Sequence, residues 1–284
     1  MRGCRSMRKS AVRSVARRCC SMTAPARFAG PPSPRIALVI GGAGGIGAAI
    51  CRNLARVGNV IAVADIDGDA ANDVALSLGH GSHAGFSTDV RQEAAVEALF
   101  ASAEAAIGDI AILVYVAGGP LVDPSQPQQI AQTSVDNWEQ TETLNARGLF
   151  LATRAFFRRR EVRPVAQARL ITIGSMAGVA PSGLHTGVAY AASKAAAINL
   201  TRFAALEGAP LGITANAIAP GTILTDTVRA QLTPEQIAAI ARETPVGRIG
   251  RPENIAAAVE FLAAPDADFM TGCVLEVNGG RHMG

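Results

Sequence analysis

The sequence predicts one α/β domain in which about seven parallel strands form a single sheet covered by helices on both faces. Apolar runs suited to buried strands occur at residues 36–40, 60–64, 110–116, 169–173, 213–218 and 273–277, and helical stretches alternate with them. A further short strand near residues 84–88 would bring the number to seven. From Arg35 onward about 250 residues remain, which suffices for one large core, and the chain carries no internal repeat.

The first predicted strand ends in a glycine-rich turn. Residues 36–40 read Ile-Ala-Leu-Val-Ile, and residues 41–47 read Gly-Gly-Ala-Gly-Gly-Ile-Gly. Beyond the turn, Ile46, Ile50 and Leu54 recur at four-residue spacing, which is the apolar stripe of a helix. Glycines let the backbone approach a pyrophosphate, and the helix N-terminus offers free N–H groups with a partial positive charge. The strand, turn and helix together predict a doubly wound, Rossmann-type sheet that binds a dinucleotide.

Asp65 ends the second apolar run, eighteen residues after Gly47. A carboxylate at this place can accept the hydrogens of both hydroxyls of an adenosine ribose, and it repels a 2′-phosphate. Neither the glycine turn nor the segment just after Asp65 contains an arginine or lysine that would bind such a phosphate. The pattern therefore favours NAD over NADP. The alternative is that Asp65 only ends a strand and opens the turn Asp65-Ile66-Asp67-Gly68.

Tyr190 and Lys194 stand four residues apart, and Lys194 is the only lysine after residue 30. On a helix the two side chains share a face. An ammonium ~4 to 5 Å from a phenol, at an effective dielectric constant of roughly 20, favours the phenolate by about 3 to 4 kcal/mol. We therefore expect Lys194 to lower the pKa of Tyr190 into the range of an acid/base catalyst. The alternative is a solvated pair that arose by chance, since Tyr-x-x-x-Lys occurs in many helices.

These motifs and several others resemble the short-chain dehydrogenase/reductase (SDR) family over about residues 35–281. The glycines at 41, 45 and 47 match the family's Gly-x-x-x-Gly-Ile-Gly turn, and Ala117-Gly118 matches the end of its Asn-Asn-Ala-Gly motif. The other matching segments are Asp89-Val90, Leu144-Asn145-Ala146-Arg147-Gly148, Ser175 after the strand at 170–173, Pro220-Gly221-Thr222-Ile223 with Thr225, Gly250-Arg251-Pro252-Glu253, and Val277-Asn278-Gly279-Gly280.

The resemblance implies an NAD-dependent oxidoreductase that interconverts a secondary alcohol and a ketone. Tyr190 would exchange a proton with the oxygen of this small-molecule substrate, and Ser175 would stabilise the developing charge by a hydrogen bond. Lys194 would lower the pKa of Tyr190 and bind the nicotinamide ribose, and Asn145 would bend its helix around an ordered water that links Lys194 to solvent. The implied cofactor-binding residues are Gly41, Gly44, Gly45, Ile46, Gly47, Asp65, Ile66, Asp89, Val90, Val116, Ala117, Gly118, Tyr190, Lys194, Pro220, Gly221, Ile223 and Thr225. The alternative is a catalytically silent NAD-binding protein of the same fold.

Some positions depart from the family pattern. Ile40 replaces a threonine, Ala111 replaces an aspartate, and Tyr115-Val116 replaces two asparagines whose side chains normally tie neighbouring strands together. We interpret Tyr115, which lies in an apolar strand, as a core residue. Fourteen residues separate Ser175 from Tyr190, about two more than the family usually has.

The N-terminal segment differs in charge from the rest of the chain. The first 21 residues carry seven basic side chains and no acidic one. Without them 19 of the 26 basic residues remain against 23 acidic ones, and the formal charge changes from +3 to −4, so the basic pI gives no ground for a nucleic-acid-binding surface on the body. We expect residues 1–34 to be a disordered tail, which is either a mitochondrial transit peptide or a mis-assigned start before Met22, and residues 35–284 to be the catalytic domain. The bias towards arginine fits a GC-rich bacterial genome and favours a cytoplasmic protein.

The remaining features predict neither a membrane span nor a metal site. The longest uncharged stretch around the first strand, residues 36–51, contains five glycines and is shorter than the ~20 residues that a spanning helix needs. His80 and His83 lie in a glycine- and serine-rich loop without a third ligand nearby in sequence. Cys51 and Cys273 are expected to be small buried residues, and the arginines at 158–160 are expected to mark the solvated end of a helix.

The substrate is less closely defined. We expect the segment at 222–241 to form a mobile lid whose apolar side chains include Leu224 and Val228, which suits a partly apolar alcohol or ketone. A 3-hydroxyacyl thioester, a cyclic secondary alcohol, a cis-diol and a steroid all remain open. The alanine-rich helix at 191–206 lets another helix approach closely. With the family habit of tetramers, we expect a homotetramer.

Overall fold

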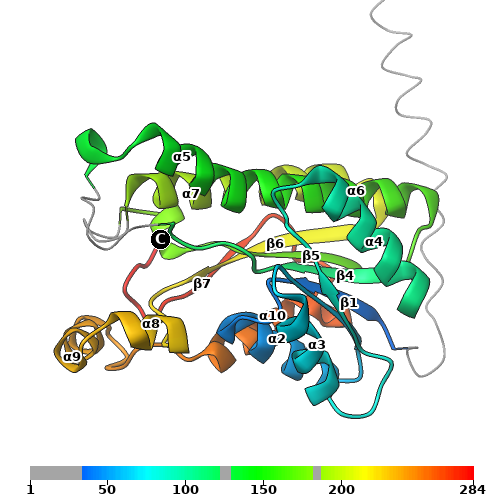
Figure 1. Ribbon diagram of the computed structural model, residues 1–284, viewed down its shortest axis with the longest axis horizontal. Helices are drawn as coiled ribbons and strands as arrows, with labels where there is room; N and C mark the ends of the chain where they lie inside the picture. The colour runs from blue at the N-terminus through cyan, green and yellow to red at the C-terminus, as the bar shows by residue number, and fades with distance from the viewer. Residues whose placement is uncertain (1–33, 122–128, 182–186) are drawn as a thin grey trace, which may run out of the picture. The chain divides into compact units, whose positions relative to one another are not determined.

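The computed structural model describes residues 34–121, 129–181 and 187–284. These residues form one seven-stranded, entirely parallel sheet in the order β3-β2-β1-β4-β5-β6-β7, with helices on both faces (Figure 1). The predicted fold class is therefore confirmed. The predicted tail, up to residue 33, lies outside the described residues.

Every predicted apolar run becomes a strand, with some ends shifted by a residue or two. The strands are β1 (Ile36–Ile40), β2 (Val60–Asp65), β3 (Ala84–Ser87), β4 (Ile110–Tyr115), β5 (Ala168–Ile173), β6 (Ile213–Pro220) and β7 (Val274–Val277). In β1, Ala37 and Val39 belong to the core on one face of the sheet, and Leu38 and Ile40 belong to the core on the other. Because both faces are covered, the strand is apolar throughout rather than alternating.

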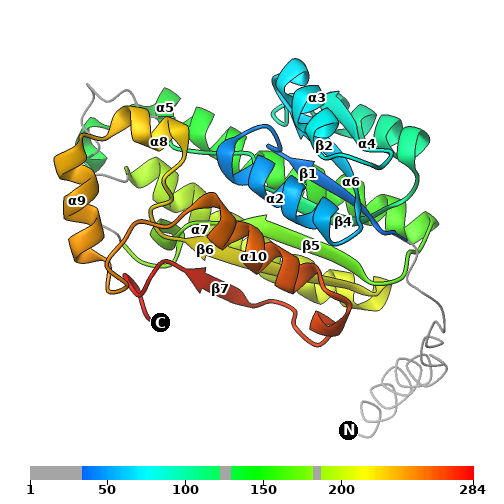
Figure 2. The ribbon, with the colours of Figure 1, turned by 90° about the horizontal axis from the view of Figure 1, so that it is seen from below.

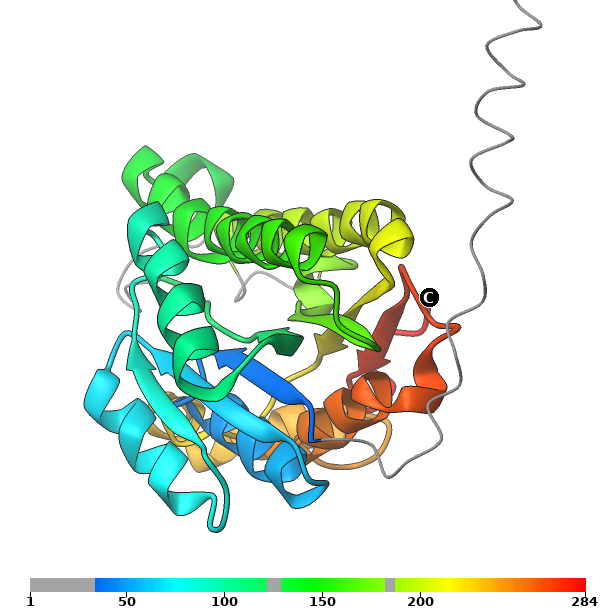
Figure 3. The same ribbon diagram turned by 90° about the vertical axis from the view of Figure 1, so that its right-hand side faces the viewer.

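Two helical layers enclose the sheet, as Figures 2 and 3 show from two directions. One layer contains α2 (Gly45–Arg56), α3 (Gly68–Ser77) and α10 (Pro252–Ala263), and the other contains α4 (Glu93–Ile107), α5 (Val135–Glu142), α6 (Gly148–Val162) and α7 (Val188–Gly208). The expected lid segment carries two helices, α8 (Asp226–Gln231) and α9 (Pro234–Glu243). Within the described part of the chain, every helix is too short or too polar to cross a bilayer.

The strand order reverses at β1, which pairs with β2 on one side and with β4 on the other. In such sheets ligands bind outside the carboxyl ends of the strands at this reversal. Here the N–H groups of Gly41 and Gly42 donate to the Ala64 carbonyl at 2.8 and 2.9 Å, and the Val116 N–H donates to the Ile40 carbonyl at 2.8 Å. These hydrogen bonds fix the glycine turn between the ends of β2 and β4.

The arginine run at the end of α6 corrects one sequence prediction. Arg158 is largely exposed as expected, but the Arg160 side chain is fully buried and pairs with Glu104 of α4. The Glu104 side chain is 2% exposed and also binds Arg159 and Arg163. Since a buried guanidinium needs a partner, the packing of α4 against α6 explains why this helix end is not wholly solvated.

The two body cysteines have different environments. Cys51 lies in α2 with no exposed surface, as predicted, and burial raises the pKa of its thiol to about 12. Cys273 is exposed, so the prediction that it is buried was wrong. It directly precedes β7, which is the edge strand of the sheet and is only partly covered.

Candidate active site

The glycine turn is shaped to receive an anion. Gly41 has φ 83°, and a Cβ on Gly47 would lie 2.0 Å from the Gly41 carbonyl oxygen, so both positions need glycine. Gly44 caps α2 without a side-chain hydrogen bond, the first turn of the helix contains no acidic residue, and Gly44 and Gly45 are exposed. The N–H groups at the start of α2 therefore face open space, as a pyrophosphate site requires.

Asp65 lies beside this turn at the end of β2. Its Oδ2 accepts a hydrogen bond from the Ala43 N–H at 3.1 Å, and its Oδ1 accepts one from the Asp67 N–H at 3.4 Å. The helix α3 is capped by Asp67 instead, whose Oδ1 accepts from the Ala70 N–H at 3.0 Å. Asp65 thus ends β2 and bonds within the turn, as the alternative expects, and its carboxylate also adjoins the glycine turn, so its binding of a ribose stays a prediction.

Asp89 and Val90, which the resemblance implies as cofactor-binding residues, lie in different environments. Both oxygens of Asp89 accept hydrogen bonds from the Arg91 guanidinium, at 2.8 and 3.0 Å, and this interaction lowers the pKa of Asp89. Val90 is buried, and its side chain lies next to Gly148 at the start of α6. Asp89 therefore pairs with Arg91, which the sequence motif does not indicate. Val90 packs against the start of α6.

The end of β4 connects the cofactor turn with the catalytic candidates. A Cβ built on Gly41 would lie 2.5 Å from the Ala117 nitrogen, so the glycine turn and the β4 end are in close contact. Gly118 has φ 135°, and a Cβ there would lie 2.1 Å from Asn145 Oδ1 and 3.3 Å from Lys194 Nζ. Glycine at 118 thus allows the chain to pass next to both side chains.

Asn145 lies in a π-helix, Thr143–Arg147, that joins α5 to α6. Its side chain is 1% exposed and makes three hydrogen bonds. Oδ1 accepts from the Gly119 N–H at 2.9 Å, and Nδ2 donates to the Gly119 carbonyl at 3.1 Å and to Ser193 Oγ at 3.0 Å. The helix thus changes to a π-helical turn at Asn145, while the bend around an ordered water that the resemblance implies stays a prediction.

Tyr190 and Lys194 lie one turn apart near the start of α7. Lys194 Nζ is 5.8 Å from the centre of the Tyr190 ring and donates to the Ile173 carbonyl at 3.0 Å, next to the end of β5. Ser175 follows that strand and hydrogen bonds with Tyr190. Lys194 is buried, whereas Tyr190 is partly exposed. Together with Asn145, the four predicted catalytic side chains form one cluster at the carboxyl ends of β4 and β5.

The titration of this cluster corrects the expected electrostatics. Burial raises the pKa of Tyr190, and the hydrogen bond with Ser175 opposes this rise only in part. Burial also lowers the pKa of Lys194 from its ordinary value of 10.5 to about 8. The expectation that Lys194 lowers the pKa of Tyr190 was therefore wrong in its net direction, because desolvation of the phenolate is the larger effect. Tyr190 is a neutral phenol at neutral pH.

The segment after β6 lies against the glycine turn. Ile223 is buried and forms a bridge with Gly250, and a Cβ on Gly45 would lie 3.1 Å from the Thr225 side chain. Thr225 Oγ1 also accepts from the Val228 N–H at 3.2 Å and so caps α8. Pro220 ends β6, and Gly221 lies close to the backbone of the 276–280 segment.

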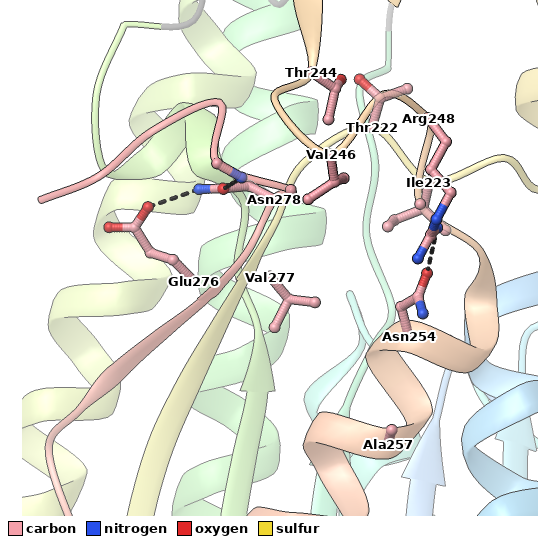
Figure 4. A pocket seen from close by; sticks show the side chains of 13 residues that line it. Thr222, Ile223, Thr244, Val246, Arg248, Asn254, Ala257, Glu276, Val277 and Asn278 are labelled. Carbon is pink, nitrogen blue, oxygen red and sulfur yellow. Dashed lines mark hydrogen bonds between the residues drawn. The ribbon is translucent and has the colours of Figure 1, made fainter. Parts of the chain in front are cut away.

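A cavity of about 390 Å³ is lined in part by this segment (Figure 4). It is lined by Thr222, Ile223, Thr244, Val246, Arg248, Gly250, Asn254, Ala257 and residues 276–280. Its polar side chains bind one another, since Arg248 Nη1 donates to Asn254 Oδ1 at 3.1 Å and Asn278 Nδ2 donates to Glu276 Oε2 at 2.7 Å. Its lining shares Ile223 with the predicted cofactor residues and, among the described residues, includes no catalytic candidate.

The structure adds two residues to the cluster that sequence reasoning missed. Ser193 is fully buried; its hydroxyl accepts from Asn145 and donates to the Tyr190 carbonyl at 2.8 Å. Tyr115 is buried as predicted, but its hydroxyl donates to the Leu144 carbonyl at 3.0 Å. The only sequence signal for either was position, since Ser193 directly precedes Lys194 and Tyr115 occupies a motif position.

The two histidines of the predicted loop do not form a metal centre in the described residues, where no three His, Cys, Asp or Glu side chains gather. His83 Nδ1 accepts a hydrogen bond from the Ile61 N–H at 3.0 Å, and burial lowers its pKa. This ring therefore ties the β2 region to the loop before β3.

Comparison with known proteins extends the likeness over most of the chain. The family model described as enoyl-(acyl carrier protein) reductase matches residues 41–282. Galactitol 2-dehydrogenase (L-tagatose-forming) of Cereibacter sphaeroides is 36% identical over 245 residues, 86% of this chain and 93% of that protein. Cis-4-hydroxycyclohexanecarboxylate dehydrogenase of Sinomonas cyclohexanicum is 35% identical over 248 residues, 87% and 96% of the two chains.

A solved structure agrees with these relatives. The crystal structure of gox2181 superposes with a TM-score of 0.79 at 32% sequence identity, and the match covers 88% of this chain and 96% of that one. The relatives, the family model and the parallel sheet with its glycine turn lead to the same assignment. The chain belongs to the short-chain dehydrogenase/reductase family and is an oxidoreductase with a nicotinamide cofactor.

Proposed function

We propose that the protein is an NAD-dependent dehydrogenase that interconverts a secondary alcohol and a ketone, with Tyr190 as the acid/base. The observation that carries this proposal is the single cluster of Asn145, Ser175, Tyr190 and Lys194 beside the glycine turn. Tyr190 and Ser175 are partly exposed, whereas Asn145 and Lys194 are buried, so Tyr190 and Ser175 are the members of this cluster that can reach a substrate. We further propose that residues 35–284 form the catalytic domain and that the protein is cytoplasmic.

The residues around the turn fit a nicotinamide dinucleotide. When bound, the nucleotide supplies the hydride chemistry. The free N–H groups at the start of α2 would hold its pyrophosphate, and Gly118 leaves room for the nicotinamide ribose near Lys194. The Asp65 carboxylate would accept the ribose hydroxyls. Its charge, and those of Asp67 and Asp69 just after it, oppose a 2′-phosphate and support NAD over NADP.

The protonation states give each catalytic side chain a role. Because burial keeps Tyr190 neutral, its hydroxyl is ready to donate a proton to a ketone oxygen, and it accepts that proton in the oxidative direction. The Ser175 hydroxyl would bind the same oxygen and stabilise the charge that develops on it. Lys194, with a pKa of about 8, remains mostly cationic at neutral pH, and an ordered water held at Asn145 would link it to solvent and return the proton.

Two of the relatives support a small secondary alcohol and its ketone as substrate and product. Their names denote the oxidation of a polyol and of a hydroxylated cyclohexane carboxylate. In this chain Thr225 lies next to Gly45 of the glycine turn, and its neighbours in the expected lid segment include the apolar Leu224 and Val228. We propose a partly apolar secondary alcohol of this size as substrate.

The same family membership supports an oligomer, and we propose a homotetramer. Phe150 of α6 and Phe203 and Leu206 of α7 are large apolar side chains that are 45%, 55% and 75% exposed. Burying them against other copies would remove apolar surface from water. Light scattering after size exclusion should give four times the chain mass, and Phe203→Glu should reduce it; a monomer for the unaltered protein would contradict the proposal.

The cofactor preference is tested by titrating NAD and NADP separately while following nicotinamide fluorescence of the reduced forms. We expect NAD(H) to bind at least about tenfold more tightly, since two charge-assisted hydrogen bonds are at stake. Asp65→Ala should weaken the binding of NAD(H) and reduce the difference in affinity between NAD(H) and NADP(H). Asp73→Ala removes an exposed carboxylate farther along α3 and serves as the matched control. Tighter binding of NADP by the unaltered protein would refute the preference.

The enzyme assignment is tested by screening secondary alcohols for NADH production and ketones for NADH consumption. Tyr190→Phe removes only the hydroxyl and should reduce kcat by about 100-fold or more, in the range of general acid–base catalysis. Nucleotide affinity should stay within about twofold. If Tyr190→Phe turned over substrate as fast as the unaltered protein, the proposed mechanism would be wrong.

A further inference from the structure

Tyr115 is a buried residue whose hydroxyl contacts the helical turn that carries Asn145. It is the last residue of β4 and directly precedes the segment that contacts the glycine turn. Its side chain is 1% exposed, and its hydroxyl donates a hydrogen bond to the Leu144 carbonyl oxygen at 3.0 Å. Burial raises the pKa of Tyr115, so the hydroxyl stays protonated and remains a donor.

The acceptor of this hydrogen bond belongs to the π-helix that carries Asn145. The helical layer runs from α5 through Thr143–Arg147 into α6, and only this five-residue turn departs from α-helical hydrogen bonding (Figure 1). A π-helical turn is uncommon and persists where other contacts hold it. Tyr115 supplies such a contact from the sheet to Leu144, the residue before Asn145.

The Tyr115 hydroxyl also lies against a glycine of the same helical segment, Gly148. A Cβ on Gly148, the first residue of α6, would lie 2.3 Å from Tyr115 Oη and 3.1 Å from Val90 Cγ2. An alanine at 148 would therefore displace the hydroxyl from its position. Tyr115 and Gly148 fit each other, one on the strand and one on the helix, with the π-helix between Gly148 and α5.

We propose that Tyr115 is a positioning residue, whose hydroxyl anchors the π-helix through Leu144 so that Asn145 reaches Gly119 and Ser193. The catalytic consequence rests on the proposed function, in which Asn145 acts with Tyr190 and Lys194. The path is short, because Asn145 Nδ2 donates to Ser193 Oγ, and Ser193 Oγ donates to the Tyr190 carbonyl. Loosening the π-helix would then loosen the support of Tyr190 itself.

The first test compares Tyr115→Phe with Thr201→Val, which also removes a buried hydroxyl. Thr201 lies on α7, and its Oγ1 donates to the Ala197 carbonyl and shares a hydrogen bond with the Thr172 hydroxyl, both at 2.9 Å. Amide hydrogen exchange of the peptide covering residues 143–149 should become about tenfold faster in Tyr115→Phe and stay unchanged in Thr201→Val, since one hydrogen bond is lost at the turn in only one variant. Equal exchange in both variants would overturn the proposal.

The catalytic readout separates positioning from general weakening. Tyr115→Phe should lower kcat by about fivefold to tenfold, leave KM and the NADH dissociation constant within about twofold, and shift the apparent pKa of the pH profile of kcat. Thr201→Val should leave the profile in place. A uniform loss of active protein with an unchanged profile would show that Tyr115 is a packing residue only.

A double-mutant cycle tests the fit between Tyr115 and Gly148 directly. Gly148→Ala should accelerate exchange at 143–149 and lower kcat in the unaltered background, and it should add at most about twofold in the Tyr115→Phe background, where the hydroxyl is absent. Additive effects would refute the coupling. The proposed function fails if no substrate is turned over, or if Tyr190→Phe is as active as the unaltered protein. Hydrogen exchange needs no turnover, so the exchange cycle still decides in either case whether Tyr115 holds the π-helix.

Discussion

Replacing Lys194 by methionine should abolish catalysis and stabilise the fold at neutral pH. Lowering the pKa of a lysine from 10.5 to about 8 means that burial disfavours its charged form by about 3 kcal/mol. Methionine has a similar length and no charge, so it removes this penalty while filling the same space. The lost hydrogen bond to the Ile173 carbonyl costs about 1 kcal/mol. The net gain in unfolding free energy is therefore about 2 kcal/mol at pH 7.

The sign of this effect makes it dependent on pH. The pKa of Lys194 is lower in the folded protein than in the unfolded chain, so the unfolded chain binds the proton more readily between pH 8 and 10.5. Stability is complete above pH 10.5 and is lost as the pH falls towards 8. At pH 9.5 the penalty shrinks to about 1 kcal/mol, which the lost hydrogen bond cancels. The advantage of Lys194→Met should thus disappear at alkaline pH.

Thermal unfolding at pH 7 and pH 9.5, at one protein concentration, measures this difference. For a domain of this size, about 2 kcal/mol corresponds to a rise in Tm of about 4 to 8 °C at pH 7. Arg202→Met removes an exposed cation from the same helix and should change Tm by less than about 2 °C at both pH values. A Lys194→Met protein less stable than the unaltered one at pH 7, or a gain that is the same at both pH values, would refute the buried-ammonium account.

Two further perturbations test the scaffold and the nucleotide turn. Glu104→Gln removes the nearer carboxylate of the buried Arg160 guanidinium, leaving Asp109 at 4.0 Å, and should destabilise the fold by about 3 kcal/mol in chemical denaturation. Glu97→Gln, at an exposed pair, should cost less than about 1 kcal/mol, and equal costs would contradict the assignment. Gly44→Ala adds a methyl to open space and should keep Tm within about 2 °C while weakening NADH binding at least tenfold, because the methyl enters the pyrophosphate site. Gly47→Ala should instead lower Tm by several degrees, since its Cβ would collide with the Gly41 carbonyl; unimpaired NADH binding by Gly44→Ala would place the nucleotide elsewhere.

The strands and the cofactor turn could be predicted because local patterns determine them. A parallel strand that is covered on both faces is apolar throughout, so the apolar run at 36–40 predicts a buried strand. The glycines at 41 and 47 are required by a positive φ and by a backbone contact, and both requirements act within a few residues. The positions of Tyr190 and Lys194 on one helix follow from spacing alone.

The protonation of the cluster could not be predicted in the same way. Spacing gives the distance between a phenol and an ammonium, but the pKa of each also depends on how much solvent the fold removes. Burial raises the pKa of Tyr190 and lowers the pKa of Lys194, so it favours the neutral form of both side chains. The extent of this burial depends on how α7 packs on the sheet, which spacing does not reveal. The buried pairing of Arg160 with Glu104 escaped prediction for the same reason, since its partner lies on another helix.

Gly118 explains why the fold can hold both the cofactor turn and the catalytic cluster. The cofactor residues come from the ends of β1, β2 and β4, whereas Asn145 and Lys194 come from the helical layer on one side of the sheet. The two sets can meet only where a strand end passes between them without a side chain, and a Cβ at 118 would lie 2.1 Å from Asn145 Oδ1. The Tyr115 anchor lies three residues earlier on the same chain segment. One stretch of backbone at the end of β4 therefore touches the glycine turn and passes next to Asn145 and Lys194, which joins the two proposed parts of the site.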